Sequence, residues 1–169
     1  MKKLRVGILG ATGMVGQQFI SLLANHPWFR VSCVAASPQS AGKSYINTVT
    51  GRWKLLSTIP KQIGKLKVRA VEKDRENIAK DVDLVFCALD MEKEQIKKIE
   101  EDYAQLGIAV ISNNSAHRWT EDVPMIIPEI NADHLRLINS QRKNRGWKKG
   151  LIVVKPNCSI QAYVSILTA

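Results

Sequence analysis

Residues 4–16 read "LRVGILGATGMVG", a stretch that predicts the first strand, turn and helix of a nucleotide-binding fold. An apolar run at 4–9 leads into three glycines, and "MVGQQFISLLAN" (14–25) follows with apolar residues at helical spacing. In such a unit Gly10 permits a tight turn, Gly13 lets the backbone approach a pyrophosphate, and Gly16 allows the helix to pack closely on the strand. The free N–H groups and the helix dipole attract an anion. Because the spacing is GxxGxxG and not GxGxxG, a packing turn without a ligand stays the alternative.

The rest of the chain alternates between strands and helices. We expect strands at 30–37, 67–71, 83–89, 108–112 and 151–154, helices near 74–80, 92–107 and 131–146, and an irregular stretch at 38–66. Asn131 is the expected cap of the last of these helices, and Gly146 its end. Apolar strands separated by helices are typical of a parallel sheet covered on both faces. The predicted fold class is therefore α/β, a doubly wound, mostly parallel, Rossmann-like sheet, whose ligands bind beyond the carboxyl ends of the strands.

The end of the second strand indicates which dinucleotide would bind. An NAD site usually places Asp or Glu there, but residues 35–43 read "AASPQSAGK" and contain no carboxylate. Ser37, Ser40 and Lys43 offer hydroxyls and a positive charge instead. Residues 1–71 contain eleven Lys or Arg and no Asp or Glu, which favours the extra phosphate of NADP. The alternative is an ordinary polar loop.

Composition limits the remaining possibilities. With 169 residues and 45% hydrophobic content, the chain can form one domain, or one domain and the start of a second. No apolar run approaches the roughly 20 residues that cross a bilayer, so we expect no membrane partner. The net charge of +10 would suit nucleic acid, an acidic membrane, a phosphorylated small molecule or simply a solvated surface. Nucleic acid is disfavoured because the cations are scattered and not interleaved with stacking aromatics.

The three cysteines differ in their surroundings. Their small, odd number predicts reduced thiols in a cytoplasmic protein. Cys33 and Cys87 lie inside apolar strands and are expected to be inert core residues. Cys158 follows a Pro-Asn turn in "KPNCSI" (155–160), with "SIQAYVSILTA" as a predicted helix behind it, and a thiol at a helix N-terminus is activated. The residues alone leave open whether Cys158 is catalytic or structural; no second Cys or His at ligand spacing suggests a metal.

Five motifs occur here in one order: "GATGMVG", "SAGK", "ISNNSAHR" (111–118), "DVPMIIPEINADHL" (122–135) and "KPNCS" (155–159). Together they resemble the N-terminal part of aspartate-semialdehyde dehydrogenase, in the branch found in archaea and fungi, over essentially the whole chain. The resemblance implies that Cys158 is the nucleophile, that Asn157 helps to bind substrate and nicotinamide, and that Arg118 binds phosphate. The expected cofactor-binding residues are Gly10, Thr12, Gly13, Met14 and Val15 at the pyrophosphate, Ser37, Ser40 and Lys43 at the 2′-phosphate, and Leu89, Asn113 and Ser115 nearby.

The resemblance implies a reaction as well. L-Aspartyl-4-phosphate would be reduced with NADPH to aspartate semialdehyde through a cysteine thioester, in the biosynthesis of lysine, threonine, methionine and isoleucine. A malonyl- or succinyl-CoA reductase of the same fold is the nearest alternative, and a non-catalytic NADP-binding module is another.

Family members are much longer than this chain. Their acid–base histidine, a carboxylate-binding arginine and most of the subunit interface lie downstream of the cysteine. We therefore expect residues 1–155 to form the dinucleotide-binding domain and 156–169 the start of a catalytic domain. The 169-residue chain by itself should be inactive, and the full-length form a homodimer or homotetramer.

Overall fold

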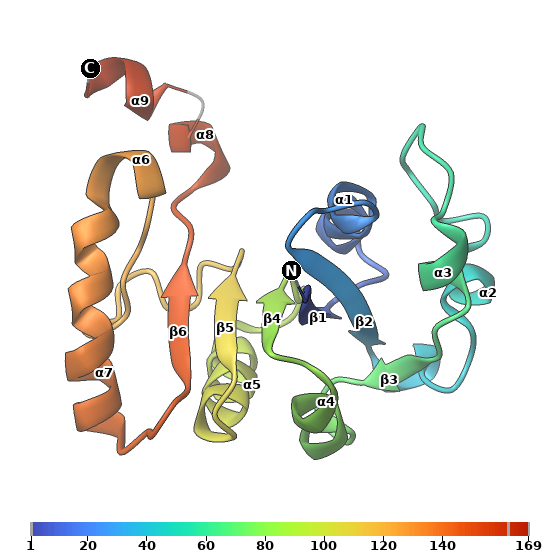
Figure 1. Cartoon of the computed structure of the whole chain (residues 1–169), viewed down its shortest axis with the longest axis horizontal. Helices are drawn as coiled ribbons and strands as arrows, with labels where there is room; N and C mark the ends of the chain where they lie inside the picture. The colour runs from blue at the N-terminus through green and yellow to red at the C-terminus, as the bar shows by residue number, and fades with distance from the viewer. Residues whose placement is uncertain (1, 162, 169) are drawn as a thin grey trace. The chain divides into compact units, whose positions relative to one another are not determined.

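The structure is a computed structural model that describes residues 2–161 and 163–168. By its internal contacts the chain divides into two compact units, Met1–Asp90 and Met91–Ala169. The first unit holds four parallel strands in the order β3-β2-β1-β4 (Figure 1). Their bounds are β1 Leu4–Leu9, β2 Phe29–Ala36, β3 Val68–Ala70 and β4 Leu84–Cys87.

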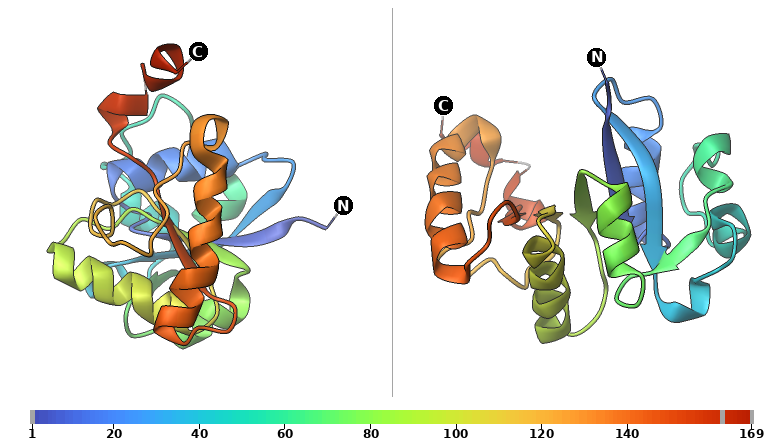
Figure 2. Two further views of the ribbon diagram at one scale, coloured as in Figure 1. Left: turned by 90° about the vertical axis from the view of Figure 1, so that its left-hand side faces the viewer. Right: turned by 60° about the horizontal axis from the view of Figure 1, so that its bottom comes forward.

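The centre of the first unit is strand β1, which has a partner strand on each side. Helices α1 (Met14–Leu23) and α4 (Arg75–Asp81) lie on opposite faces of β1 and β2 (Figure 2). Val6, Ile8 and Leu9 are consequently fully buried. Burying an aliphatic side chain of this size stabilises a fold by roughly 1.5–3 kcal/mol. The apolar runs read from the sequence are therefore strands enclosed on both faces, as predicted.

The stretch predicted to be irregular contains three short helices: η1 (Pro38–Ser40), α2 (Tyr45–Val49) and α3 (Lys61–Gly64). The prediction was wrong here because three to five residues are too few to show helical periodicity. Local hydrogen bonds and packing form these turns instead. In α2, the Ser44 hydroxyl accepts the amide of Asn47 at 3.4 Å, and the buried Tyr45 hydroxyl donates to the Ala11 carbonyl at 2.8 Å.

The second unit contains two parallel strands, β5 (Ala109–Ser112) and β6 (Leu151–Val154), paired from Ala109↔Leu151 to Ser112↔Val154. Gln141, which is buried, extends the pairing of β6: its Nε2 donates to the Ile152 carbonyl at 3.0 Å, and its Oε1 accepts the Ile152 amide at 2.8 Å. The helices of this unit are α5 Lys93–Gln105, α6 Pro128–Asn131, η2 Ala132–Arg136, α7 Leu137–Arg145, α8 Cys158–Gln161 and α9 Val164–Leu167.

The helix predicted over 131–146 is interrupted. Its α-helical part, α7, begins only at Leu137 and ends, as predicted, at Gly146, which has a left-handed φ of 67°. Asn131 does not cap it. The Asn131 side chain accepts the amide of Ile127 at 2.8 Å and donates to the Met125 carbonyl at 2.9 Å, so it is used by the loop that precedes it. A cap residue and a loop-bracing Asn look the same in sequence.

The strands and helices alternate in both units, which confirms the doubly wound α/β class. Within the part of the chain that the structure describes, no helix has the length and apolar character that a bilayer crossing requires.

Candidate functional site

The glycine turn has the geometry that the sequence predicts. Gly10 adopts a φ of +83°, and its amide donates to the Ala35 carbonyl of β2 at 2.9 Å. A Cβ on Gly10 would lie 2.2 Å from the Ala88 carbonyl oxygen, and one on Gly16 would lie 2.2 Å from the Gly10 oxygen. Both glycines are therefore required by the close approach of backbone to backbone.

Gly13 differs from the other two glycines of the turn. It has an ordinary φ of −74° and is exposed, and a Cβ there would meet only the Gly10 oxygen, at 3.5 Å. Packing alone would therefore accept a side chain at this position. Gly13 precedes α1 and makes no side-chain cap, and the first turn of this ten-residue helix carries no acidic residue. Open space before an uncapped helix N-terminus is a good fit for a pyrophosphate group.

The loop after β2 lies at the same edge of the sheet as the glycine turn. Leu9 of β1 pairs with Ala35 of β2, so both strands end side by side. Ser37 and Lys43 are exposed on this loop, whereas Ser40 is largely buried and donates its amide to the Ser37 carbonyl at 3.0 Å. The structure thus brings the predicted pyrophosphate turn together with the predicted 2′-phosphate loop.

Leu89 follows the strand on the other side of β1. The amide of Ala88 donates to the Leu9 carbonyl at 2.8 Å, which holds this end of β4 against the turn. The Leu89 side chain itself is 8% exposed. Leu89 therefore lies beside the turn, two residues past the end of β4, and its contact with a cofactor stays a prediction.

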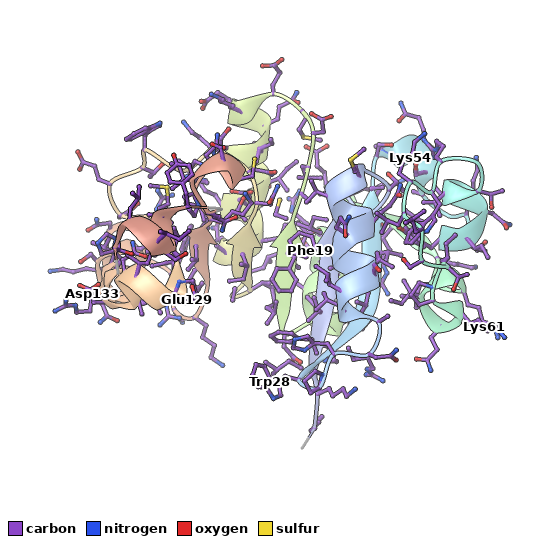
Figure 3. The ribbon with its side chains drawn as sticks, turned by 90° about the horizontal axis from the view of Figure 1, so that it is seen from above. Phe19, Trp28, Lys54, Lys61, Glu129 and Asp133 are labelled. Carbon is purple, nitrogen blue, oxygen red and sulfur yellow. The ribbon has the colours of Figure 1, made fainter. Side chains whose placement is uncertain are left out.

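Gln17 is a contributor that sequence reasoning missed. Only 2% of it is exposed, and its Nε2 donates to the carbonyls of Thr12 and Arg52, both at 3.0 Å. Its Oε1 accepts the amide of Lys54 at 2.8 Å, and Figure 3 shows Lys54 beside the N-terminal end of α1. Gln17 therefore ties the basic loop around Lys54 to the glycine turn. The sequence did hold a sign of this role: Gln17 falls on the apolar side of an amphipathic helix, and a buried polar side chain needs hydrogen-bond partners.

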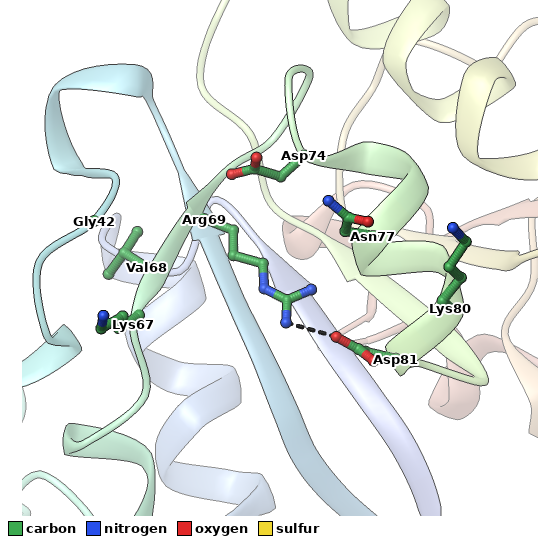
Figure 4. Close-up of a pocket in the computed structure, with 8 residues that line it drawn as sticks. All are labelled: Gly42, Lys67, Val68, Arg69, Asp74, Asn77, Lys80 and Asp81. Atoms are coloured by element: carbon green, nitrogen blue, oxygen red, sulfur yellow. Dashed lines mark hydrogen bonds and ion pairs between the residues drawn. The ribbon is translucent and has the colours of Figure 1, made fainter.

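A surface cavity of about 530 Å³ lies between β3 and α4 (Figure 4). Basic and acidic side chains line it together, and the Arg69 guanidinium donates to the Asp81 carboxylate at 2.6 Å. None of the predicted site residues is among its lining residues, which are Gly42, Lys67, Val68, Arg69, Asp74, Asn77, Lys80 and Asp81.

The second unit holds the predicted thiol on the turn that follows β6. Cys158 is exposed, and its Sγ lies 3.5 Å from the Asn157 Oδ1. The same Oδ1 accepts the amide and the hydroxyl of Ser159 at 3.0 and 2.9 Å. Asn157 therefore shapes the turn that presents the thiol.

Arg118 is anchored to the residue from which this turn starts. Its Nε donates to the Lys155 carbonyl at 3.2 Å. The pKa of the Lys155 ammonium is lowered, first by burial and then by the charge of Arg118, while Cys158 acts in the opposite direction. Asn113 and Ser115 precede Arg118 on the same loop, half-buried and exposed respectively. The structure thus brings a guanidinium, an ammonium and an exposed thiol together within this unit.

The other two cysteines are buried, as predicted. Burial raises the pKa of the Cys33 thiol to about 11. The continuous helix predicted behind Cys158 was wrong in extent, because α8 has four residues and α9 begins at Val164. Ile166 and Leu167 of α9 are exposed, and short helices are marginal without an apolar face to pack against.

A buried polar cluster underlies the Arg118 loop. Glu100, Ser112, Asn114 and His117 are all buried. The sequence did not single out any of them for this, because Glu100 lies on a helix 12 residues before Ser112 and their contact is set by the tertiary fold. His117 is 1% exposed, and its Nδ1 lies 3.1 Å from the Thr120 hydroxyl.

We expect His117 to make the fold sensitive to acid. Its pKa is lowered, chiefly by burial, while the charge of Glu101 partly opposes the shift. A lowered histidine pKa means that the unfolded chain binds the proton more readily. Stability is therefore complete above the unfolded pKa of about 6.5 and is lost as the pH falls below it.

Urea unfolding at pH 7.5 and 5.5 measures this effect. The midpoint should fall with acid in the wild type and in His134→Gln, an exposed histidine on η2, but much less in His117→Gln. An equal fall in His117→Gln would show that other groups cause the acid sensitivity.

Comparison with known proteins identifies the family. Residues 5–138 match the family described as "Semialdehyde dehydrogenase, NAD binding domain". The chain belongs to this family. The aspartate-semialdehyde dehydrogenase of Archaeoglobus fulgidus is 46% identical over 91% of this chain and 42% of its own length, and that of Schizosaccharomyces pombe is 38% identical over 98% of this chain and 44% of its own. The resemblance read from the five motifs is thereby confirmed.

Two further matches bear on the cofactor and the substrate. The crystal structure of the Candida albicans aspartate-semialdehyde dehydrogenase with NADP superposes with a TM-score of 0.85 at 35% identity, over 98% of this chain and 46% of that one. The malonyl CoA reductase (NADP) of Metallosphaera sedula is 39% identical over 99% of this chain and 44% of its own length. This member of the semialdehyde dehydrogenase family thus spans less than half the length of each of these relatives.

Proposed function

We propose that this chain carries the NADP-binding part and the nucleophile of an aspartate-semialdehyde dehydrogenase. The reaction would be the NADP-dependent reductive dephosphorylation of L-aspartyl-4-phosphate to aspartate semialdehyde, a step toward lysine, threonine, methionine and isoleucine. The observation that carries the proposal is the exposed Cys158 on the Asn157 turn, with Arg118 bonded to the Lys155 carbonyl beside it. The similarity to archaeal and fungal aspartate-semialdehyde dehydrogenases supports the choice of substrate.

The glycine turn and the loop after β2 would hold the dinucleotide. The open space at Gly13 and the uncapped start of α1 fit a pyrophosphate, while Ser37 and Lys43 are exposed where a 2′-phosphate would lie. Bound there, NADPH would supply a hydride. The remaining predicted contacts are Gly10, Thr12, Met14, Val15, Ser40, Leu89, Asn113 and Ser115.

The residues of the second unit would perform the acyl transfer. The Cys158 thiolate attacks the acyl carbon of the substrate, a C–S bond forms, and the C–O bond to phosphate breaks to leave a thioester. The Arg118 guanidinium offers two parallel N–H donors to the leaving phosphate. After reduction of the thioester carbonyl, the C–S bond breaks, the thiolate leaves and the aldehyde is released. Asn157 positions Cys158 by bracing the turn, because its Oδ1 accepts the amide and the hydroxyl of Ser159.

The wider organisation follows from the same assignment. Residues 1–155 would be the dinucleotide-binding domain and 156–169 the start of the catalytic domain. The natural-length protein would be a cytoplasmic homodimer or homotetramer.

One experiment tests the assignment on the natural-length polypeptide. NADPH formation from aspartate semialdehyde is followed with and without inorganic phosphate, because phosphate must cleave the thioester in this direction. Turnover that requires phosphate supports the proposal. No such turnover, together with oxidation of NADPH by malonyl-CoA, would assign the chain to a CoA-dependent reductase instead, the second candidate that the Metallosphaera sedula relative favours.

We expect Ser37→Asp to reverse the cofactor preference. A carboxylate at the end of β2 would repel a 2′-phosphate and accept the 2′-hydroxyl of NAD. NADP affinity of the 169-residue chain should fall about tenfold or more, equivalent to about 1.4 kcal/mol, while NAD affinity should hold or rise. Titration calorimetry measures both constants.

Gln39→Asp is the matched control, since it places the same charge two residues further along the exposed loop. If both variants lose NADP affinity equally, Ser37 makes no direct contact with the cofactor.

A further inference from the structure

Glu100 is an acidic residue on the buried face of α5. None of its surface is exposed, and its neighbours on that face, Ile96, Ile99 and Tyr103, are buried apolar or aromatic residues. Burying a carboxyl group is costly even where hydrogen bonds compensate, so an apolar residue would serve the packing of α5 better. The polar group therefore calls for an explanation other than stability.

The carboxyl group holds the end of strand β5. Its Oε1 accepts the Ser112 hydroxyl at 2.5 Å and the Asn114 Nδ2 at 3.3 Å. The Ser112 hydroxyl in turn accepts the Asn114 amide at 3.0 Å. On the other carboxyl oxygen, Oε2 lies 4.0 Å from the Nε2 of His117, which is also buried. Glu100 thus fixes the backbone and side chains of the loop that starts at Ser112.

The same network reaches the thiol turn. The Ser112 carbonyl accepts the Lys155 amide at 3.0 Å, and the Lys155 carbonyl accepts the Arg118 Nε at 3.2 Å. Lys155 lies three residues before Cys158. The Ser112 side chain is therefore hydrogen-bonded to Glu100, and its backbone carbonyl is hydrogen-bonded to Lys155. Lys155 in turn provides the carbonyl that accepts Arg118 and belongs to the segment that carries Cys158. A displacement of Ser112 would therefore also move Arg118 and Cys158.

We propose that Glu100 is a positioning residue for the phosphate-binding and thiol site. It acts through Ser112, holding the Arg118 loop in register with the turn that presents Cys158. The roles of Arg118 and Cys158 in this statement rest on the proposed function, whereas the mechanical coupling rests only on the hydrogen bonds above.

Amide hydrogen exchange measures the coupling without any activity. In the 169-residue chain, Glu100→Ala should lower the protection of the Asn114 and Lys155 amides about tenfold or more, with the amides of β1 and β2 unchanged. Glu100→Gln still offers an acceptor to the Ser112 hydroxyl, so this variant should keep most of the protection of the Asn114 and Lys155 amides. Glu94→Gln, an exposed carboxyl on the same helix, is the matched control and should change nothing at these amides.

Two results would overturn the coupling: unchanged protection at Asn114 and Lys155 in Glu100→Ala, or an equal loss across both units, which would indicate general destabilisation. Should Glu100→Ala fail to fold, Ser112→Ala removes the same link from the other side. Because this substitution also removes the acceptor of the Asn114 amide, the protection of the Lys155 amide alone decides there.

Kinetics of the natural-length protein test the consequence for the site. A displacement of about 1 Å can cost about 100-fold, so Glu100→Ala should raise the KM for phosphate by about 10- to 100-fold with a smaller change in kcat, and Glu100→Gln should restore most of it. A fall in kcat alone, with KM unchanged, would overturn the positioning role. If the wild type shows no phosphate-dependent turnover, the proposed function fails, and the exchange profiles alone decide the role of Glu100.

Discussion

Cys158→Ala in the natural-length protein is expected to lower turnover of aspartate semialdehyde by about 1,000-fold or more, because loss of a covalent nucleophile removes the whole acyl-transfer route. Within residues 1–169, neither of the other two cysteines is placed to replace it. Cys33 and Cys87 are buried in the strands β2 and β4, and the pKa of Cys33 is raised by burial to about 11. The assay is NADPH formation in the presence of phosphate.

Cys33→Ala is the matched control, since it removes a thiol of the same chain without touching the thiol turn. It should keep turnover near that of the wild type. If Cys158→Ala retained a tenth or more of the activity, the thioester route through Cys158 would be wrong.

The 169-residue chain offers a second, activity-independent measurement of the same thiol. Brief treatment of the folded chain with iodoacetamide should modify Cys158 alone, because it is the exposed cysteine. Peptide mass spectrometry locates the label. Modification of Cys33 or Cys87 at a similar rate would show that the strands open more readily than their burial implies.

The parts of the fold that could be predicted are those where one physical requirement dominates. The part of strand β1 from Val6 to Leu9 is buried, so the apolar residues there predict a strand enclosed on both faces. Gly10 and Gly16 are dictated by backbone contacts that no other residue permits. Gly146 ends α7 with a left-handed φ, as its place after a basic last turn indicates.

The parts that could not be predicted depend on contacts between distant residues. Gln17 braces a loop 35 residues away, and Glu100 binds a serine 12 residues away. In sequence each is a polar residue within an amphipathic helix, and its partner is set by the tertiary fold. Asn131 has the composition of a helix cap but is used by the preceding loop. The sequence placed Cys158 on a turn after the last strand, where the structure has it exposed, whereas it did not predict the polar network around Glu100.

Gly10→Ala is expected to destabilise the first unit by about 3 kcal/mol or more, because a Cβ there combines a strained positive φ with a backbone collision. The Cβ would lie 2.2 Å from the Ala88 oxygen and 2.6 Å from the Ala88 carbonyl carbon. Urea unfolding measures the loss. Gly42→Ala is the control, since Gly42 has a similar φ of +84° but open space around it. Equal losses would mean that conformational strain, and not the contact with β4, makes Gly10 necessary.

Gly13→Ala should separate the fold from the ligand. Its ordinary φ and the 3.5 Å distance from a Cβ to the Gly10 oxygen predict a stability within about 0.5 kcal/mol of the wild type. The added methyl group would nevertheless occupy the space into which a pyrophosphate must come, so NADP affinity of the 169-residue chain should fall about tenfold or more. Wild-type affinity in this variant would mean that the dinucleotide does not approach the turn at Gly13. If Gly13→Ala loses NADP affinity but keeps the wild-type free energy of unfolding, the glycine serves ligand binding, because nothing in the packing of the turn requires it.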